Sequence, residues 1–279
     1  MNECKKIMPE RLYPLDPNMS LEKILQAKEL GTPLVGKAIL WNSQANCLEI
    51  NLGNNFYGFI PEDRVSVYPV FAPDDPQKLS ASIRSLIGNP VLVNVVEVDD
   101  SDGSMAITLS RKENMLHAFD AITNLVGKSI ECCVTSIKNF GIYVDVGNGI
   151  NGLIHHSELS LSRFNHFSEM GIRVGDKIIV KVLSVNNNFH VALNYRDQFK
   201  NLTFTLNPGD LIEAIVLESV NQEGNFAYLN PNTPAIVDIP PRVHCYYGEK
   251  IVARVKGPSK KRPDSIKLSF VSFVNDCGL

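Results

Sequence analysis

The sequence predicts an all-β chain with a few short helices, built from three small units in tandem. Short runs of alternating apolar and polar residues recur, as in Cys47-Leu48-Glu49-Ile50-Asn51-Leu52, and this alternation is typical of half-buried strands. A glycine followed by a charged residue opens strands at Gly36-Lys37, Gly175-Asp176 and Gly209-Asp210. The unit repeats about every 85–90 residues, which is long enough for each copy to close its own small barrel.

Composition places the chain among ordinary globular proteins. Its 279 residues suffice for two or three small domains, and 44% hydrophobic and 20% charged residues are typical values. The sequence contains no run of roughly 18 apolar residues, so we expect no membrane span. Lys5 and Lys6 are not followed by an apolar run, which argues against a signal peptide and predicts a cytoplasmic location.

The cysteine pattern and the charge distribution limit the kinds of functional site that we expect. None of the six cysteines forms a C-x-x-C pair, so neither zinc binding nor dithiol redox chemistry is indicated. The net charge of −3 divides unevenly: −5 over residues 1–126, +2 over 127–196 and zero over 197–279. A positive middle between less positive flanks predicts one main electrostatic contact zone in the central unit.

The units and their connections can be placed along the chain. Residues 1–31 form a tail and a short helix, with Ser20 as its N-cap and Gly31 as its end. In the first unit the insertion 68–80, with three prolines, is interpreted as a loop. The predicted boundaries are 1–31 for the tail and helix, 32–113 for the first barrel, 114–126 for a linking helix, 127–196 for the central barrel, 197–208 for a linker and 209–279 for a divergent third barrel.

The central unit carries the most specific motifs. Gly127-Lys128-Ser129 opens a strand, Phe140-Gly141-Ile142-Tyr143 carries two aromatic residues three apart, and Gly152-Leu153-Ile154-His155-His156-Ser157 follows. This order resembles the S1 RNA-binding domain, a small OB-type barrel. The resemblance implies three tandem OB-fold, S1-type, five-stranded barrels, similar to short bacterial homologues of ribosomal protein S1.

The resemblance also implies a set of RNA-binding residues. In the family, two aromatic residues of the second strand, a histidine after the third strand, and an aspartate and an arginine near the last hairpin contribute to one face. Phe140, Tyr143 and His155 match the first three, whereas Asn186 and His190 stand where the aspartate and arginine are usual. Further candidates for stacking or for phosphate contacts are Lys138, Phe189, Arg163, Arg173, Lys260, Lys261 and Arg262.

Each candidate also has a structural interpretation. Residues three apart face opposite sides of a regular strand, so Phe140 or Tyr143 could be a core residue unless Gly141 permits a bulge or turn. The adjacent His155 and His156 have no carboxylate or thiolate at ligand spacing, so we predict no metal site. The cations are often plain solvated surface.

The sequence therefore predicts a non-enzymatic, cytoplasmic protein without a cofactor. It would bind single-stranded RNA mainly through the central barrel, in translation or RNA metabolism, with the small ribosomal subunit as a partner to consider. The alternative is an adaptor whose acidic first barrel docks a ribosome, polymerase or nuclease. An enzyme ranks third, because no nucleophile set, phosphate loop or carboxylate cluster stands out.

Overall fold

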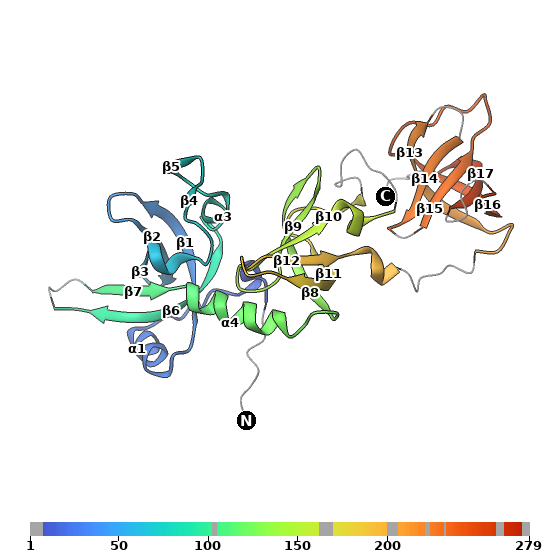
Figure 1. The fold of residues 1–279 in the computed structure, drawn as a ribbon. Helices are drawn as coiled ribbons and strands as arrows, with labels where there is room; N and C mark the ends of the chain where they lie inside the picture. The colour runs from blue at the N-terminus through green and yellow to red at the C-terminus, as the bar shows by residue number, and fades with distance from the viewer. Residues whose placement is uncertain are drawn as a thin grey trace. The chain divides into compact units, whose positions relative to one another are not determined.

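The computed structural model of the chain describes residues 8–101, 105–161, 170–199, 206–220, 224–231, 233–260 and 265–274. Figure 1 draws and labels the elements. The chain divides into two compact units. The first contains Met1–Cys133, Val144–Gly152 and Ser184–Val191, and the second contains Val134–Tyr143, Leu153–Leu183 and Ala192–Leu279. Among the described residues, no helix has the length and apolar character needed to cross a membrane.

Five strands close a first barrel in the order β1-β2-β3-β7-β6. Neighbouring strands are antiparallel except β3 and β7, which pair in parallel at Phe59 and Thr108. The strands are β1 (Leu34–Asn42), β2 (Cys47–Gly53), β3 (Phe56–Pro61), β6 (Pro90–Asp99) and β7 (Ala106–Ser110).

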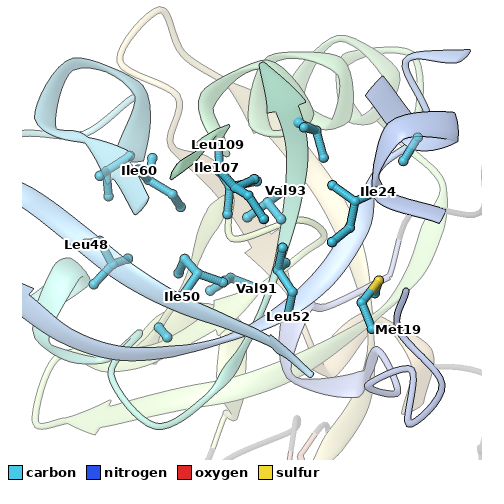
Figure 2. Packing of buried hydrophobic residues seen from close by; sticks show 14 of the residues in the cluster. Met19, Ile24, Leu48, Ile50, Leu52, Ile60, Val91, Val93, Ile107 and Leu109 are labelled. Carbon is cyan, nitrogen blue, oxygen red and sulfur yellow. The ribbon is translucent and has the colours of Figure 1, made fainter. Parts of the chain in front are cut away.

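The interior of this barrel is filled by aliphatic side chains. Leu48, Ile50 and Leu52 alternate along β2 and are at most 1% exposed, as the apolar–polar pattern predicts. Figure 2 shows them in one cluster with Val93 of β6 and with Ile24, which comes from helix α1 (Leu21–Leu30). Burying each such side chain contributes about 1.5–3 kcal/mol, so α1 is an integral part of this core.

Local signals explain where the helices begin and end. The Ser20 side chain accepts a hydrogen bond from the Lys23 backbone N–H, and Gly31 ends α1 with a φ of 62°, a left-handed conformation that glycine adopts without strain. The expected linking helix is α4 (Lys112–Thr123), which buries Met115, Ala118 and Ile122 on one side. The remaining short helices of this part are η1 (Glu10–Leu12), α2 (Glu62–Val65) and α3 (Ala81–Arg84).

The insertion at 68–80 is more ordered than its prolines suggest. It contains a two-stranded sheet of β4 (Phe71–Ala72) and β5 (Asp75–Leu79). Phe71 meets Trp41 of β1 edge-to-face, with ring centroids 5.9 Å apart. The interpretation of this stretch as a plain loop was therefore incomplete, because Phe71 and Leu79 pack against the barrel core and anchor the hairpin.

The central strands are hydrogen-bonded in the order β10-β12-β11-β8-β9. In each repeat the first strand adjoins the second and the fourth, and the third adjoins the fifth, so the neighbour relations match those of the first barrel. The elements are β8 (Ser129–Lys138), β9 (Gly141–Asp145), β10 (Asn151–His155), α5 (His156–Leu159), β11 (Lys177–Val185), β12 (Val191–Asn194) and η3 (Arg196–Phe199).

Five strands in the last part of the chain close another barrel in the order β13-β14-β15-β17-β16, and each strand pairs with both of its neighbours. Its core includes small residues such as Ala214, Ala227, Ala235 and Ala253. The strands are β13 (Leu211–Val220), β14 (Gly224–Asn230), β15 (Thr233–Asp238), β16 (Lys250–Pro258) and β17 (Ile266–Phe273).

Candidate nucleic-acid interface

Phe140 and Tyr143 lie together on the surface. Phe140 occupies the turn between β8 and β9, outside the strand, so the alternation of strand faces does not separate it from Tyr143. Ile142 and Val144 point into the core and are fully buried, which turns Tyr143 outward. The two rings meet edge-to-face with centroids 5.9 Å apart, and Phe140 is 46% exposed.

Gly141 brings this turn close to the end of β10. A Cβ added at Gly141 would lie 2.3 Å from the Ile154 carbonyl oxygen and 3.1 Å from the His155 Cα. Only glycine fits such an approach without a backbone shift. The His156 backbone N–H also donates to the Phe140 carbonyl oxygen at 2.9 Å, so the turn is fixed beside His155.

His155 is exposed at the start of helix α5. Its Nδ1 lies 2.9 Å from Ser157 Oγ, and its ring centroid is 4.1 Å from that of His156. Glu158 Oε2 accepts a hydrogen bond from Asn194 Nδ2, and the Glu158 carbonyl oxygen accepts one from the Tyr195 backbone N–H at 2.9 Å. These bonds connect α5 to the end of β12. We call the surface made by Phe140, Tyr143 and His155 the Phe140 face.

Two of the predicted cations near this part of the chain are described. Lys138 is exposed at the end of β8. Arg173 is exposed, and its backbone N–H donates to Asp176 Oδ2 at 2.7 Å. Arg163 lies outside the described residues. Phosphate contacts by these side chains stay predictions.

Asn186, Phe189 and His190 lie in the hairpin between β11 and β12. Asn186 Oδ1 accepts hydrogen bonds from the backbone N–H groups of Asn188 and His190, both at 3.0 Å. Phe189 has a φ of 60°, a left-handed conformation that is costly for a bulky side chain. The Asn186 amide oxygen thus closes the turn, which stabilises this unusual backbone.

Contacts within the first compact unit hold this hairpin. The Phe189 ring meets Phe119 of α4 edge-to-face at 4.9 Å, and His190 stacks on Tyr68 at 5.5 Å with the planes 25° apart. The Tyr68 hydroxyl donates to the Phe189 carbonyl oxygen at 2.6 Å and accepts from the Asn151 N–H at 2.8 Å. Burial raises the pKa of Tyr68 to about 12, so the hydroxyl keeps its proton.

A buried charged cluster in the same unit has no counterpart in the sequence interpretation. Arg111, 2% exposed, donates from Nε and Nη2 to the two carboxylate oxygens of Glu10, at 2.8 and 2.5 Å. The Glu10 backbone N–H donates to Asp145 Oδ2 at 2.7 Å, while Gly147 and Gly149 donate to Asp145 Oδ1. Burial, with a smaller contribution from Glu10, raises the pKa of Asp145 to about 7.

This cluster joins segments that are distant in the sequence. Glu10 precedes Arg111 by 101 residues and Asp145 by 135. Tyr13 and Asn148 extend it, since the Tyr13 hydroxyl donates to Asn148 Oδ1 at 3.0 Å. The partners satisfy one another, so the cluster fastens η1 and the β9–β10 turn together rather than presenting a reactive group.

The third barrel carries the last predicted cations. Lys260 is exposed just beyond β16, whereas Lys261 and Arg262 lie outside the described residues. Across the described parts of the chain, no group of three or more His, Cys, Asp or Glu residues is arranged to hold a metal ion.

Comparisons with known proteins match part of the chain. The model of the S1 RNA-binding domain matches residues 125–196. Polyribonucleotide nucleotidyltransferase of Chlamydia trachomatis is 37% identical over 106 residues, covering 36% of this chain and 15% of that protein. Small ribosomal subunit protein bS1 of Staphylococcus saprophyticus is 26% identical over 200 residues, covering 68% of this chain and 48% of that protein.

Among solved structures, a multidomain protein with nucleic acid binding domains from Streptococcus pneumoniae is 16% identical and covers 86% of this chain and 73% of that one. The TM-score of the two structures is 0.28. The chain spans less than half the length of the two curated relatives named above. The matched residues 125–196 contain β8 to β12 and the whole Phe140 face. The chain therefore contains an S1-type domain at residues 125–196 and is similar to bS1.

Proposed function

We propose that this protein binds single-stranded RNA through the Phe140 face and acts without catalysis in translation or RNA metabolism. The observation that supports this most directly is the pair of outward rings, Phe140 and Tyr143, fixed beside His155 within the residues that match the S1 RNA-binding domain. Enzymes among the relatives match only a small share of their length, 15% for the nucleotidyltransferase. The activity of that whole protein is therefore no guide to this chain.

The geometry suits an unpaired base. Because Phe140 and Tyr143 meet at an interplanar angle of 90°, the edge of one ring packs on the face of the other, and the faces of the ring that contributes its edge are not used in the pair. A base stacked on such a face gains about 1–3 kcal/mol, with little dependence on its identity. Lys138 at the end of β8 adds a positive charge for the backbone phosphate.

The architecture around this face is part of the proposal. The central strands would close into an S1-type OB barrel like those on either side, giving three tandem domains with the boundaries expected from the sequence. The similarity to bS1 supports adding ribosome association, and with it a cytoplasmic location, to the proposal. Among the partners considered, the small ribosomal subunit is therefore the first to test.

The test is binding of a labelled single strand by fluorescence anisotropy. Phe140→Ala and Tyr143→Ala should each weaken binding by about 5- to 150-fold, the equivalent of one lost base stack. Tyr57→Ala is the matched control, since Tyr57 is 54% exposed in the first barrel and should not matter. Duplex RNA should bind more weakly than the single strand, because its bases stay stacked. Unchanged affinity in both variants would refute the proposal.

A further inference from the structure

Strand β16 presents a row of cations on its outer surface. Ile251, Ala253 and Val255 point into the core and are at most 1% exposed, so the alternate positions face outward. Three of those positions hold Lys250, Arg254 and Lys256, all exposed, with Val252 between the first two. Beyond Pro258 the same alternation reaches the exposed Lys260. We call these four residues the β16 row.

The row keeps most of its charge unpaired. In the described part of the chain, no ion pair joins Lys250, Arg254 or Lys256 to a carboxylate, whereas the neighbouring Lys267 is paired with Asp238 at 3.0 Å. Arg254 donates from Nη1 to the Gly209 carbonyl oxygen at 3.1 Å, which holds the guanidinium in place without neutralising it. Unpaired cations at alternate strand positions repel one another, so a polyanion that neutralises them is stabilised there.

The strands beside β16 contribute little opposing charge. Leu211 of β13 and Ser269 of β17 lie opposite Arg254, and Leu211 is 55% exposed. The one carboxylate at these registers is Glu213, opposite Val252. The outer surface around β16 is therefore positive although residues 197–279 have no net charge.

An exposed aromatic residue lies where the chain enters this strand. Tyr246 is 71% exposed and belongs to the turn before Lys250, in which the Glu249 backbone N–H donates to the Tyr246 carbonyl oxygen at 3.2 Å. The Glu249 carboxylate accepts from the Tyr246 backbone N–H at 2.7 Å, which engages that acidic group in the turn. The ring is thus held at the surface beside the row, where it can stack on a base.

We propose that the β16 row, with Tyr246 at its start, is a second contact for single-stranded RNA on this chain. The inference rests on the proposed function, since it adds a site for the same ligand. From Lys250 to Lys256 the row extends about 20 Å, which corresponds to several phosphates of an extended strand. Cations that follow the backbone together with a ring for the bases are the combination by which proteins bind single strands without sequence preference.

The Phe140 face and the row would bind one long RNA together. A short oligomer of about six nucleotides fits a single site, whereas a strand of about 30 nucleotides reaches two sites and gains affinity from the second. Loss of the row should therefore affect long RNA and leave short RNA bound at the Phe140 face.

The experiment compares Lys250→Gln/Lys256→Gln with Lys28→Gln/Lys37→Gln in the full chain. The control removes the same charge from two exposed lysines of the first compact unit, which carry no ion pair among the described residues. For long RNA the first variant should lower the slope of log affinity against log salt by about 1.4, or 0.7 for each lost phosphate contact. The control should leave the slope unchanged, and Tyr246→Ala should weaken long RNA but not short RNA.

The outcomes separate this inference from the proposed function. An unchanged salt slope in Lys250→Gln/Lys256→Gln, or an equal change in the control, would show that the β16 row does not contact RNA. A row that binds an acidic protein instead of RNA would also leave the salt slope unchanged. If Phe140→Ala leaves RNA binding intact while the β16 variant weakens it, RNA binding by the Phe140 face is refuted and RNA binding by the β16 row is supported. Both variants weakening long RNA, with only Phe140→Ala weakening short RNA, is the expected result.

Discussion

Tyr68→Phe tests the contact that holds the β11–β12 hairpin. The substitution removes one oxygen and leaves the ring, so the stacking on His190 persists while two hydrogen bonds are lost. Tyr68 is 9% exposed, and the Phe189 carbonyl and the Asn151 N–H would lose their partner in a place that water reaches poorly. Each unsatisfied buried polar group costs about 1–3 kcal/mol, so for the two groups we expect a loss of about 2–6 kcal/mol in unfolding free energy.

Urea unfolding measures the total loss, and hydrogen exchange of the Asn151 amide by NMR locates it. Faster exchange at Asn151 is expected, because this amide donates to the deleted hydroxyl. Tyr57→Phe is the control, since Tyr57 is 54% exposed and its change should stay within about 0.5 kcal/mol. If Tyr68→Phe unfolds like the wild type and protects Asn151 equally, the hydroxyl does not hold the hairpin.

Two further predictions concern buried positions. The pKa of Asp145 is raised to about 7 in the folded protein against 3.8 for the free group, so the folded state binds this proton more tightly. Its stabilising contribution should be complete below about pH 4 and should be lost as the pH rises to about 7; Asp145→Asn should flatten that decline in urea midpoints. Gly141→Ala should weaken RNA binding because its Cβ would press on the backbone of β10, whereas Gly36→Ala, equally crowded against Ile50 in the first barrel, should not.

The strands could be predicted because apolar and polar residues alternate along a half-buried strand as its two faces do. Leu48, Ile50 and Leu52 are apolar at every second position and are all buried. The position of Phe140 was left open, since spacing alone does not show whether a residue at a strand end belongs to the strand or to the turn before it. The close approach of Gly141 to β10 keeps Phe140 in the turn, and the sequence does not show this approach because it depends on a neighbouring strand.

The buried cluster of Glu10, Arg111 and Asp145 could not be predicted from the sequence, for a different reason. Glu10 and Arg111 are 101 residues apart, and each looks like a surface charge in its own segment. Only the fold shows that burial makes them partners, because isolated charges are not stable away from water. The β16 row, by contrast, has a signal in the sequence: Lys250, Arg254, Lys256 and Lys260 are separated by even numbers of positions, and apolar residues alternate with the first three.

The energies indicate which aromatic residue is available to RNA. To turn its ring to a base, Phe189 would have to leave Phe119. An aromatic pair is worth about 0.5–1.5 kcal/mol, so this loss offsets much of the roughly 1–3 kcal/mol that one stacked base provides. Phe140 is already 46% exposed, so a base can reach its ring while its pair with Tyr143 and the bond from the His156 N–H to its carbonyl stay in place. We therefore expect RNA to stack on Phe140 and to leave the Phe189 hairpin in place, so that Phe189→Ala lowers unfolding free energy more than RNA affinity.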